Sequence, residues 1–249
     1  MSNEVAYFWL LLTLAFVVST LGGVMLRRRK RPLVLRTIRG YQILPLLVDE
    51  AIESDRQLHV GLGGIELGKA TTLVSLAALT LLYEVNRRQA FTSSTPLVTT
   101  TDGILLTGAQ DMLRRAYATE NNLSAYHADT VVWLPTGERS LAYGAAISAI
   151  NYIDRLSNNI MVGSYGAELA LIGDVATRRD AVFVGQSIDL VGQAVAFAHA
   201  ETPILTEELF VSEAYTRPDD LRSQIQPLML DVLRWALVIA IILIAIVER

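Results

Sequence analysis

The chain has 249 residues, of which 52% are hydrophobic and 18% are charged. Soluble domains carry about a quarter of their residues as charged ones, so this balance indicates that part of the chain lies in lipid. The remainder is long enough for one domain with its own core. The absence of cysteine excludes disulfides, thiolate catalysis and cysteine-ligated zinc, and it fits a reducing compartment.

Charge is unevenly distributed along the chain, whose net charge is −4. Residues 40–217 carry 11 Lys and Arg against 20 Asp and Glu, a formal charge of −9. So acidic a segment repels phosphate backbones, which argues against nucleic acid as a partner. Seven basic residues form a block ahead of it, and we interpret this block as a topology signal at a membrane surface: Arg27, Arg28, Arg29, Lys30, Arg31, Arg36 and Arg39.

The first predicted element is a membrane-spanning helix over Val5–Leu26, a run without charge that is long enough for a hydrocarbon core of about 30 Å. Glu4 precedes the run and Arg27 follows it, which is the reverse of a cleaved signal peptide. Residues 1–31 are therefore predicted to be an anchor with a basic flank. Because positive charge stays in the cytoplasm, the amino terminus is expected outside and the domain inside.

A second span is predicted over residues 228–249, after a linker at 218–227. Its apolar stretch Trp235–Val247 is too short alone, so the helix must start near Leu228 and include Asp231 and Arg234. These two side chains are expected on one helix face at the cytoplasmic boundary. The sequence thus predicts a two-pass protein of the cell (inner) membrane with both termini outside, which a topology assay with reporters at both ends tests.

Between the spans the sequence predicts a linker and helix at 32–57, with Pro45 in the helix's first turn, and then a cytoplasmic domain at 58–217. Short apolar runs in this domain alternate with helical patterns. The predicted strands are Leu58–Leu62, Leu97–Thr100, Thr130–Leu134, Ile160–Gly163, Ala181–Gly185 and Ile204–Leu205. The predicted helices are Lys69–Arg88, Ile104–Glu120, Ser140–Leu156, Glu168–Arg179 and Ile188–Ala198. Such alternation is typical of an α/β fold with a doubly wound, mainly parallel, Rossmann-like sheet.

The glycine-rich segment after the first strand is the main candidate ligand site. Gly63–Lys69 has the G-x-x-x-x-G-K spacing of a phosphate loop, but Ala70 replaces the hydroxyl residue that would hold Mg²⁺, and Glu66 would repel phosphate. Glu66 also occupies the third-glycine position of a dinucleotide fingerprint. Contact with an anion or nucleotide and a plain strand-to-helix turn both remain open, and the candidate ligand-binding residues are Gly61, Gly63, Gly64, Gly68, Lys69 and Thr71.

No set of histidines or serines completes a catalytic or metal motif. His59, His127 and His199 lack metal-ligand spacing, so structural roles are favoured for them. Ser164 lies in Gly163-Ser164-Tyr165-Gly166, which is not the G-x-S-x-G of a nucleophile elbow. We therefore expect no catalytic residue, no metal and no cofactor.

Several carboxylates fall near predicted strand ends or helix starts. Glu168 and Asp189 fit helix caps. Asp102, Glu207 and Glu208 follow strands, and together they would give either a weak cation site or solvated surface charge. Small residues over Ala142–Ala149 predict close helix packing, against the sheet or against a second subunit.

The chain resembles a bacterial membrane-protein family catalogued only as a domain of unknown function. The resemblance covers most of the domain and rests on Leu44–Ser54, Leu58–Thr72, Val162–Glu168, Glu207–Phe210 and Ala214–Tyr215. It implies no activity, substrate or catalytic residue, and it supports treating anchor, domain and second anchor as one unit.

Two functions follow as hypotheses. The first is a non-enzymatic domain that self-associates or scaffolds partners at the lipid bilayer, because two anchors flank an acidic domain without a complete catalytic motif. The alternative is a small-molecule or nucleotide-binding module that uses the glycine-rich loop, as doubly wound folds commonly do.

Overall fold

The computed structural model describes residues 35–92, 94–134, 140–153, 156–200, 202–220 and 223–231, together with 13, 16–17, 20–21, 234–235 and 238. The chain divides into two compact units, one of which is Thr37–Ser212. None of the described helices combines the length and the apolar character needed to cross a bilayer. The spans predicted over 5–26 and 228–249 lie largely outside the described residues and stay predictions.

The centre of the unit Thr37–Ser212 is a five-stranded parallel sheet with the order β3-β2-β1-β4-β5. Its strands are β1 (His59–Gly63), β2 (Leu97–Thr100), β3 (Val131–Trp133), β4 (Asn159–Gly163) and β5 (Phe183–Ser187). The register pairs Gly63 with Gly163, so β1 and β4 end at the same level. The predicted α/β fold with a parallel sheet is therefore confirmed.

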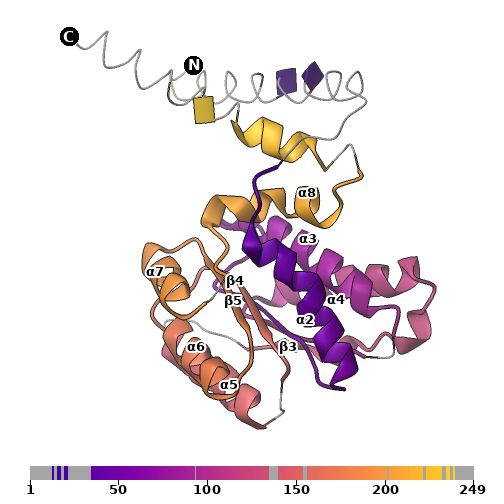
Figure 1. Ribbon diagram of the computed structural model, residues 1–249, viewed down its shortest axis with the longest axis vertical. Helices are drawn as coiled ribbons and strands as arrows, with labels where there is room; N and C mark the ends of the chain where they lie inside the picture. Colours follow the sequence, from indigo (N-terminus) through magenta and orange to yellow (C-terminus); the bar gives the residue numbers. More distant parts are fainter. Residues whose placement is uncertain are drawn as a thin grey trace. The chain divides into compact units, whose positions relative to one another are not determined.

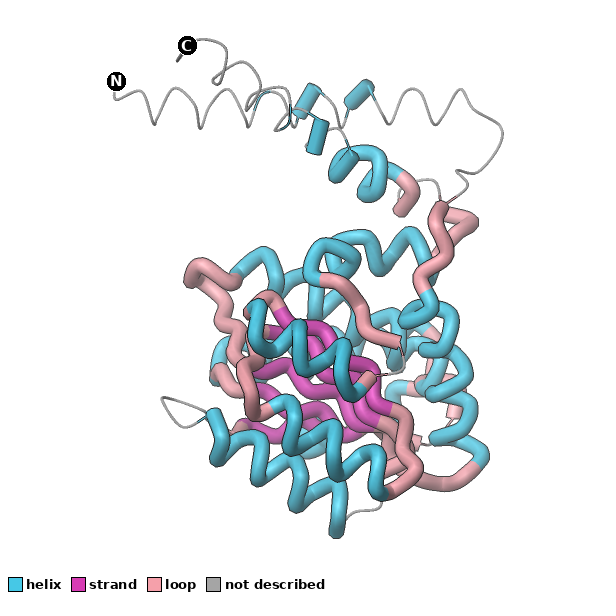
Figure 2. The backbone as a smooth tube through the Cα atoms, turned by 60° about the vertical axis from the view of Figure 1, so that its left-hand side comes forward, coloured by secondary structure: helices cyan, strands magenta, loops and turns pink. Residues whose placement is uncertain are grey.

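Helices cover both faces of this sheet (Figures 1 and 2). On one side lie α2 (Arg39–Glu53), α3 (Thr72–Gln89) and α4 (Gly103–Thr119); on the other lie α5 (Ser140–Ile153), α6 (Leu169–Arg178) and α7 (Leu190–His199). The strand order explains this division. The chain adds β2 and β3 on one side of β1 and then returns to add β4 and β5 on the other side. Because every crossover is right-handed, the helices formed after this reversal lie on the opposite face of the sheet. Shorter elements complete the chain: η1 (Leu123–Ala125), η2 (Ala128–Thr130), η3 (Thr206–Val211) and α8 (Ser212–Thr216).

Three local predictions were wrong. The sixth strand, Ile204–Leu205, does not form, because Pro203 has no N–H to donate and the segment keeps only one ladder-like bond, from Ile204 N to Gly185 O (3.1 Å). Pro45 lies inside α2 and not in its first turn. The helix after β1 begins at Thr72 and not at Lys69, because the preceding residues form a turn.

The face of the sheet under α5, α6 and α7 holds an apolar cluster, which includes Tyr143, Ile147, Met161, Tyr165, Leu169, Ile172 and Phe183. On the opposite face, α2 packs beside α3 and buries Leu44, Leu47, Val48 and Ala51. The helix before β1 is therefore part of the compact unit, whose first residue is Thr37.

A chain of hydrogen-bonded, buried polar side chains reaches Tyr143 of the apolar cluster under α5, α6 and α7. The imidazole of His59 bonds Asn159 Oδ1 through Nδ1 (2.8 Å) and Thr99 Oγ1 through Nε2 (2.9 Å). Thr99 Oγ1 also bonds the Tyr143 hydroxyl (3.2 Å), and Asn159 Nδ2 donates to Asn151 Oδ1 (2.7 Å). Because the amide nitrogen of Asn159 donates to Asn151, the amide oxygen of Asn159 is the acceptor for His59, so Nδ1 of His59 carries a proton.

The other compact unit consists of Met1–Arg36 and Glu213–Arg249, and within it the described residues 225–231 are helical. Arg234 Nη1 donates to Asp231 Oδ1 at 3.0 Å, so these two side chains lie on one helix face as predicted. Gln226 Nε2 donates to Glu213 Oε2 (2.6 Å), and the Tyr215 hydroxyl donates to Arg36 O (2.6 Å).

Candidate functional site

The candidate site lies where the strand order reverses, at the carboxyl ends of β1 and β4. Open parallel sheets usually bind ligands at this position, because the loops after the two strands part to opposite faces. Here the two loops remain in contact, since Ser164 N donates to Gly63 O at 2.9 Å. The structure brings all six predicted residues into β1 and the turn that follows it.

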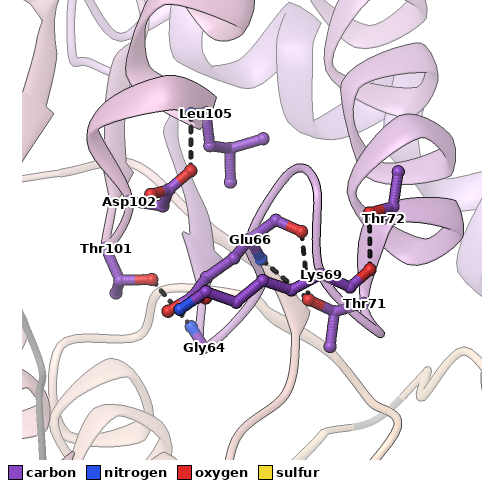
Figure 3. A network of polar contacts seen from close by, with 8 residues as sticks. All are labelled: Gly64, Glu66, Lys69, Thr71, Thr72, Thr101, Asp102 and Leu105. Atoms are coloured by element: carbon purple, nitrogen blue, oxygen red, sulfur yellow. Dashed lines mark hydrogen bonds and ion pairs between the residues drawn. The ribbon is translucent and has the colours of Figure 1, made fainter.

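Internal hydrogen bonds hold the turn between β1 and α3 (Figure 3). Gly64 N donates to Thr101 Oγ1 (3.0 Å), which ties the turn to the end of β2. The Thr71 hydroxyl accepts from Glu66 N (2.8 Å) and donates to Glu66 O (3.1 Å). Thr71 is therefore occupied in closing the turn, and it makes no side-chain cap of α3.

Gly61 and Gly63 are glycines because buried side chains of Met161 and Tyr165 pack against them. A Cβ on Gly63 would lie 2.4 Å from Tyr165 Cε1, and one on Gly61 would lie 2.5 Å from Met161 Cε. Tyr165 itself is fully buried and stacks beside Tyr143, with ring centroids 6.1 Å apart. These two positions thus have a packing explanation and do not require close approach of a phosphate.

Gly64 and Gly68 have backbone conformations that favour glycine, with φ of +64° and +84°. A Cβ on Gly64 would lie 1.9 Å from Ser164 O, whereas a Cβ on Gly68 would meet no atom within 4 Å. Gly64 therefore allows the loops after β1 and β4 to touch. Gly68 lies in open space, and it is the one predicted glycine whose surroundings leave room for a ligand.

The charge of Lys69 is already paired. Its ammonium group forms an ion pair with the Glu66 carboxylate although the lysine side chain is 70% exposed. The hydrogen bond that Lys69 donates to Glu66, together with the negative charge of that carboxylate, raises the pKa of Lys69, so the lysine stays protonated at neutral pH. A phosphate would have to displace Glu66 before it could use this cation.

The predicted carboxylates have separate roles. Asp102 and Asp189 cap α4 and α7, because their oxygens accept from Leu105 N (2.9 Å) and Val191 N (2.8 Å). The prediction that Glu168 caps the next helix was wrong, since its Oε1 accepts from Gly166 N (2.8 Å) instead. Glu208 is turned inward to accept from Leu205 N (2.8 Å), whereas Glu207 is exposed.

The three histidines lie on separate elements of the fold. Burial lowers the pKa of His59 to about 4, although the bond to Asn159 opposes the shift. His127 precedes η2 and His199 ends α7. Within the described part of the chain, no three His, Asp or Glu side chains gather as metal ligands.

Sequence reasoning missed an apolar feature of the carboxyl edge. The four crossover helices, α3 to α6, and the helix after β5, α7, each start with an exposed large apolar residue in the first turn. We call these residues the rim: Leu73, Ile104, Leu141, Leu171, Leu190 and Val191. Their exposed fractions run from 42% to 85%. Because all strands are parallel, every one of these helix starts lies at the carboxyl edge.

The exposed large apolar residues of this unit are concentrated at the carboxyl edge of the sheet. Thirteen large apolar residues are exposed among those described from Thr37 to Ser212, and seven of them are the rim residues and Trp133 at the end of β3. First helical turns ordinarily favour Asp, Glu and other polar residues. The signal was available in the sequence as one or two large apolar residues near the start of each helix.

The fold and the site define an α/β protein with a doubly wound parallel sheet, a glycine-rich turn at its switch point and an apolar rim around it. The family model described as "Domain of unknown function (DUF6754)" matches residues 2–249, so the chain belongs to that family. The predicted resemblance to a family of unknown function is thereby confirmed. No curated protein and no solved structure matches the chain.

Proposed function

We propose that the α/β domain is a non-catalytic protein-interaction module that associates through its carboxyl edge, held at the cytoplasmic face of the membrane by the two predicted spans. The observation that carries the proposal is the rim, which gives every crossover helix an exposed apolar first turn. Large apolar groups gathered on one surface mark contact sites on soluble domains.

Burial of the rim offsets much of the cost of association. Fully burying a leucine or isoleucine contributes roughly 1.5–3 kcal/mol, so the exposed fractions of the six side chains represent roughly 5–11 kcal/mol. Association costs about 4–15 kcal/mol in lost freedom. These terms nearly balance, as they do for transient scaffolding contacts, and polar contacts then decide the partner.

The first prediction uses the absence of cysteine in the chain. A photoreactive maleimide placed on Leu190→Cys of the full-length protein in native membranes is expected to form discrete protein adducts several-fold more efficiently than on Glu53→Cys. Leu190 is 85% exposed on the rim, whereas Glu53 is an exposed residue at the carboxyl end of α2. Adding Leu141→Ser should reduce the yield at position 190 while leaving thermal stability unchanged. Equal yields at both positions would contradict the proposal.

A second candidate function is small-molecule or nucleotide binding at the turn Gly64–Lys69. It is favoured by the position of this turn at the point of reversed strand order and by the open surroundings of Gly68. The ion pair between Glu66 and Lys69 opposes it, because the anion competes with a carboxylate three residues away.

Thermal-shift measurements with ATP, ADP and inorganic phosphate test this candidate. A ligand at a hundred times its Kd is expected to stabilise the wild-type protein by about 2.7 kcal/mol. Lys69→Ala should abolish the shift, and Glu66→Gln should enlarge it because the ammonium group is then released from its pair. No shift in wild type or Glu66→Gln, or a shift unchanged by Lys69→Ala, would exclude this candidate.

A further inference from the structure

Three of the helices that form the rim are neighbours. α5 packs against α6, and α6 packs against α7, on the same face of the sheet. Their exposed first-turn residues therefore form a row: Leu141, Leu171, Leu190 and Val191. We call this part of the rim the α5–α7 row.

Local contacts fix the positions of the row. A Cβ on Gly144 of α5 would lie 2.9 Å from Glu168 Cβ, so α5 closely approaches the start of α6. A Cβ on Gly192 would lie 1.8 Å from Tyr165 O, so the first turn of α7 rests against the loop after β4. The Asp189 cap holds the same turn. The row thus lies on a packed, capped scaffold, as a docking surface requires.

The spacing of the row suits an α-helix. Adjacent packed helices have axes about 8–10 Å apart, and residues i and i+7 of a helix lie about 10.5 Å apart along its axis on one face. A helix lying across the first turns of α5, α6 and α7 therefore presents one apolar residue to each of them when its apolar positions repeat every seven residues.

The charge around the row selects the sign of the partner. Residues 140–147, 169–176 and 189–197 contain Asp174 and Asp189 but no Lys or Arg. Asp174 is paired with Arg178, one turn further along α6 (3.0 Å). The whole segment 40–217 carries −9, so a cationic partner is favoured electrostatically over a second copy of this acidic domain and over anionic lipid headgroups.

We infer that the α5–α7 row binds a cationic amphipathic helix of a partner protein, whose apolar residues contact Leu141, Leu171 and Leu190 while its Lys and Arg side chains face the acidic domain. This inference rests on the proposed interaction function and names its partner class. Like other helix-in-groove contacts, it takes its affinity from spaced apolar anchors and its partner choice from charge.

Disulfide capture on the full-length protein tests the inference. The probe is a synthetic amphipathic helix of leucine and lysine, with leucines on one face repeating every seven residues and one cysteine activated as a mixed disulfide. The protein carries Val191→Cys, which leaves the three leucines in place. The control site is Glu53→Cys, which lies beside Asp49, Glu50 and Asp55 and tests charge without the apolar row. Each rate is divided by that of a small neutral disulfide to remove differences in thiol reactivity.

Capture at position 191 is expected to be about tenfold or more faster than at position 53, because each buried leucine contributes binding energy that charge alone does not. In the Val191→Cys protein, Leu171→Ser should lower the rate toward that of the control site. The matched change Leu76→Ser, at an exposed position of α3, should leave the rate unchanged.

Each other outcome overturns the inference. Equal capture at 191 and 53, or no effect of Leu171→Ser, would show that charge alone attracts the peptide. Equal capture of a leucine–glutamate peptide would refute the cationic partner. Faster formation of a Val191→Cys protein dimer would assign the row to a second copy, and protection of the thiol by phosphatidylcholine vesicles would assign it to a bilayer. The dimer outcome would leave the proposed interaction function intact. Equal photoadduct yields at positions 190 and 53 would instead contradict both the interaction function and the helical partner inferred from it.

Discussion

Gly64→Ala is expected to lower the free energy of unfolding by about 3–5 kcal/mol, the largest effect of any single methyl group in the turn after β1. Two terms add. A left-handed conformation costs an L-residue about 1–2 kcal/mol, and Gly64 has φ of +64°. The new Cβ would also lie 1.9 Å from the carbonyl oxygen of Ser164, a backbone atom held by the Ser164 N to Gly63 O bond.

The same substitution at Gly68 is the matched control. Gly68 also has a positive φ, of +84°, but its Cβ would meet no atom within 4 Å. Gly68→Ala should therefore cost only about 1–2 kcal/mol. Thermal melts of the full-length proteins should show a loss on the order of 10 °C for Gly64→Ala and of a few degrees for Gly68→Ala. Equal losses would mean that the loops after β1 and β4 do not touch as described.

This contrast bears on what glycine-rich motifs mean. Gly61, Gly63, Gly64 and Gly68 follow one another in a pattern that suggests phosphate binding. In the structure the first two accommodate Tyr165 and Met161, the third accommodates Ser164, and only the fourth faces open space. Tyr165 is about a hundred residues away in sequence, so no reading of the loop alone would separate packing from ligand contact.

The regular elements were more predictable than the site. Parallel strands buried on both faces are short, continuous apolar runs, and the bounds of β1, β2, β4 and β5 each lie within two residues of a predicted run. Ile204–Leu205 looked similar but lacked a donor at Pro203. The strand order could not be predicted from local sequence. Alternation of strands and helices predicts parallel pairing but does not specify which strands are neighbours.

The rim was overlooked for a different reason. Its residues have ordinary helix propensity, and an apolar residue near a helix start is usually assigned to the core. Leu190 follows the Asp189 cap directly, and Ile104 lies two residues after the Asp102 cap. Helical geometry then turns these side chains away from the sheet while Leu105 and Gly192 are buried. Caps and periodicity read together identify such residues; hydrophobicity alone does not.

The buried His59 has the second large expected effect, on the pH dependence of stability. Its imidazole is fully buried among Asn159, Thr99 and their partners, and burial lowers its pKa to about 4. The pKa in the unfolded chain is about 6.5. Between these values the unfolded state binds a proton that the folded state does not, so stability falls as the pH falls.

Acidification from pH 7 to about pH 4 should therefore remove about 3 kcal/mol through His59, and nothing is gained above about pH 6.5. His59→Gln keeps an amide donor and acceptor but cannot titrate, so urea unfolding of this variant should lack that slope even if its stability at pH 7 is lower. Subtracting the two pH profiles cancels groups common to both proteins. One such group is Asp49, whose pKa the hydrogen bond from Arg88 lowers. A difference profile that is flat between about pH 6.5 and pH 4 would mean that His59 is protonated or solvated in the folded protein, and the buried position of its ring between Asn159 and Thr99 would then be wrong.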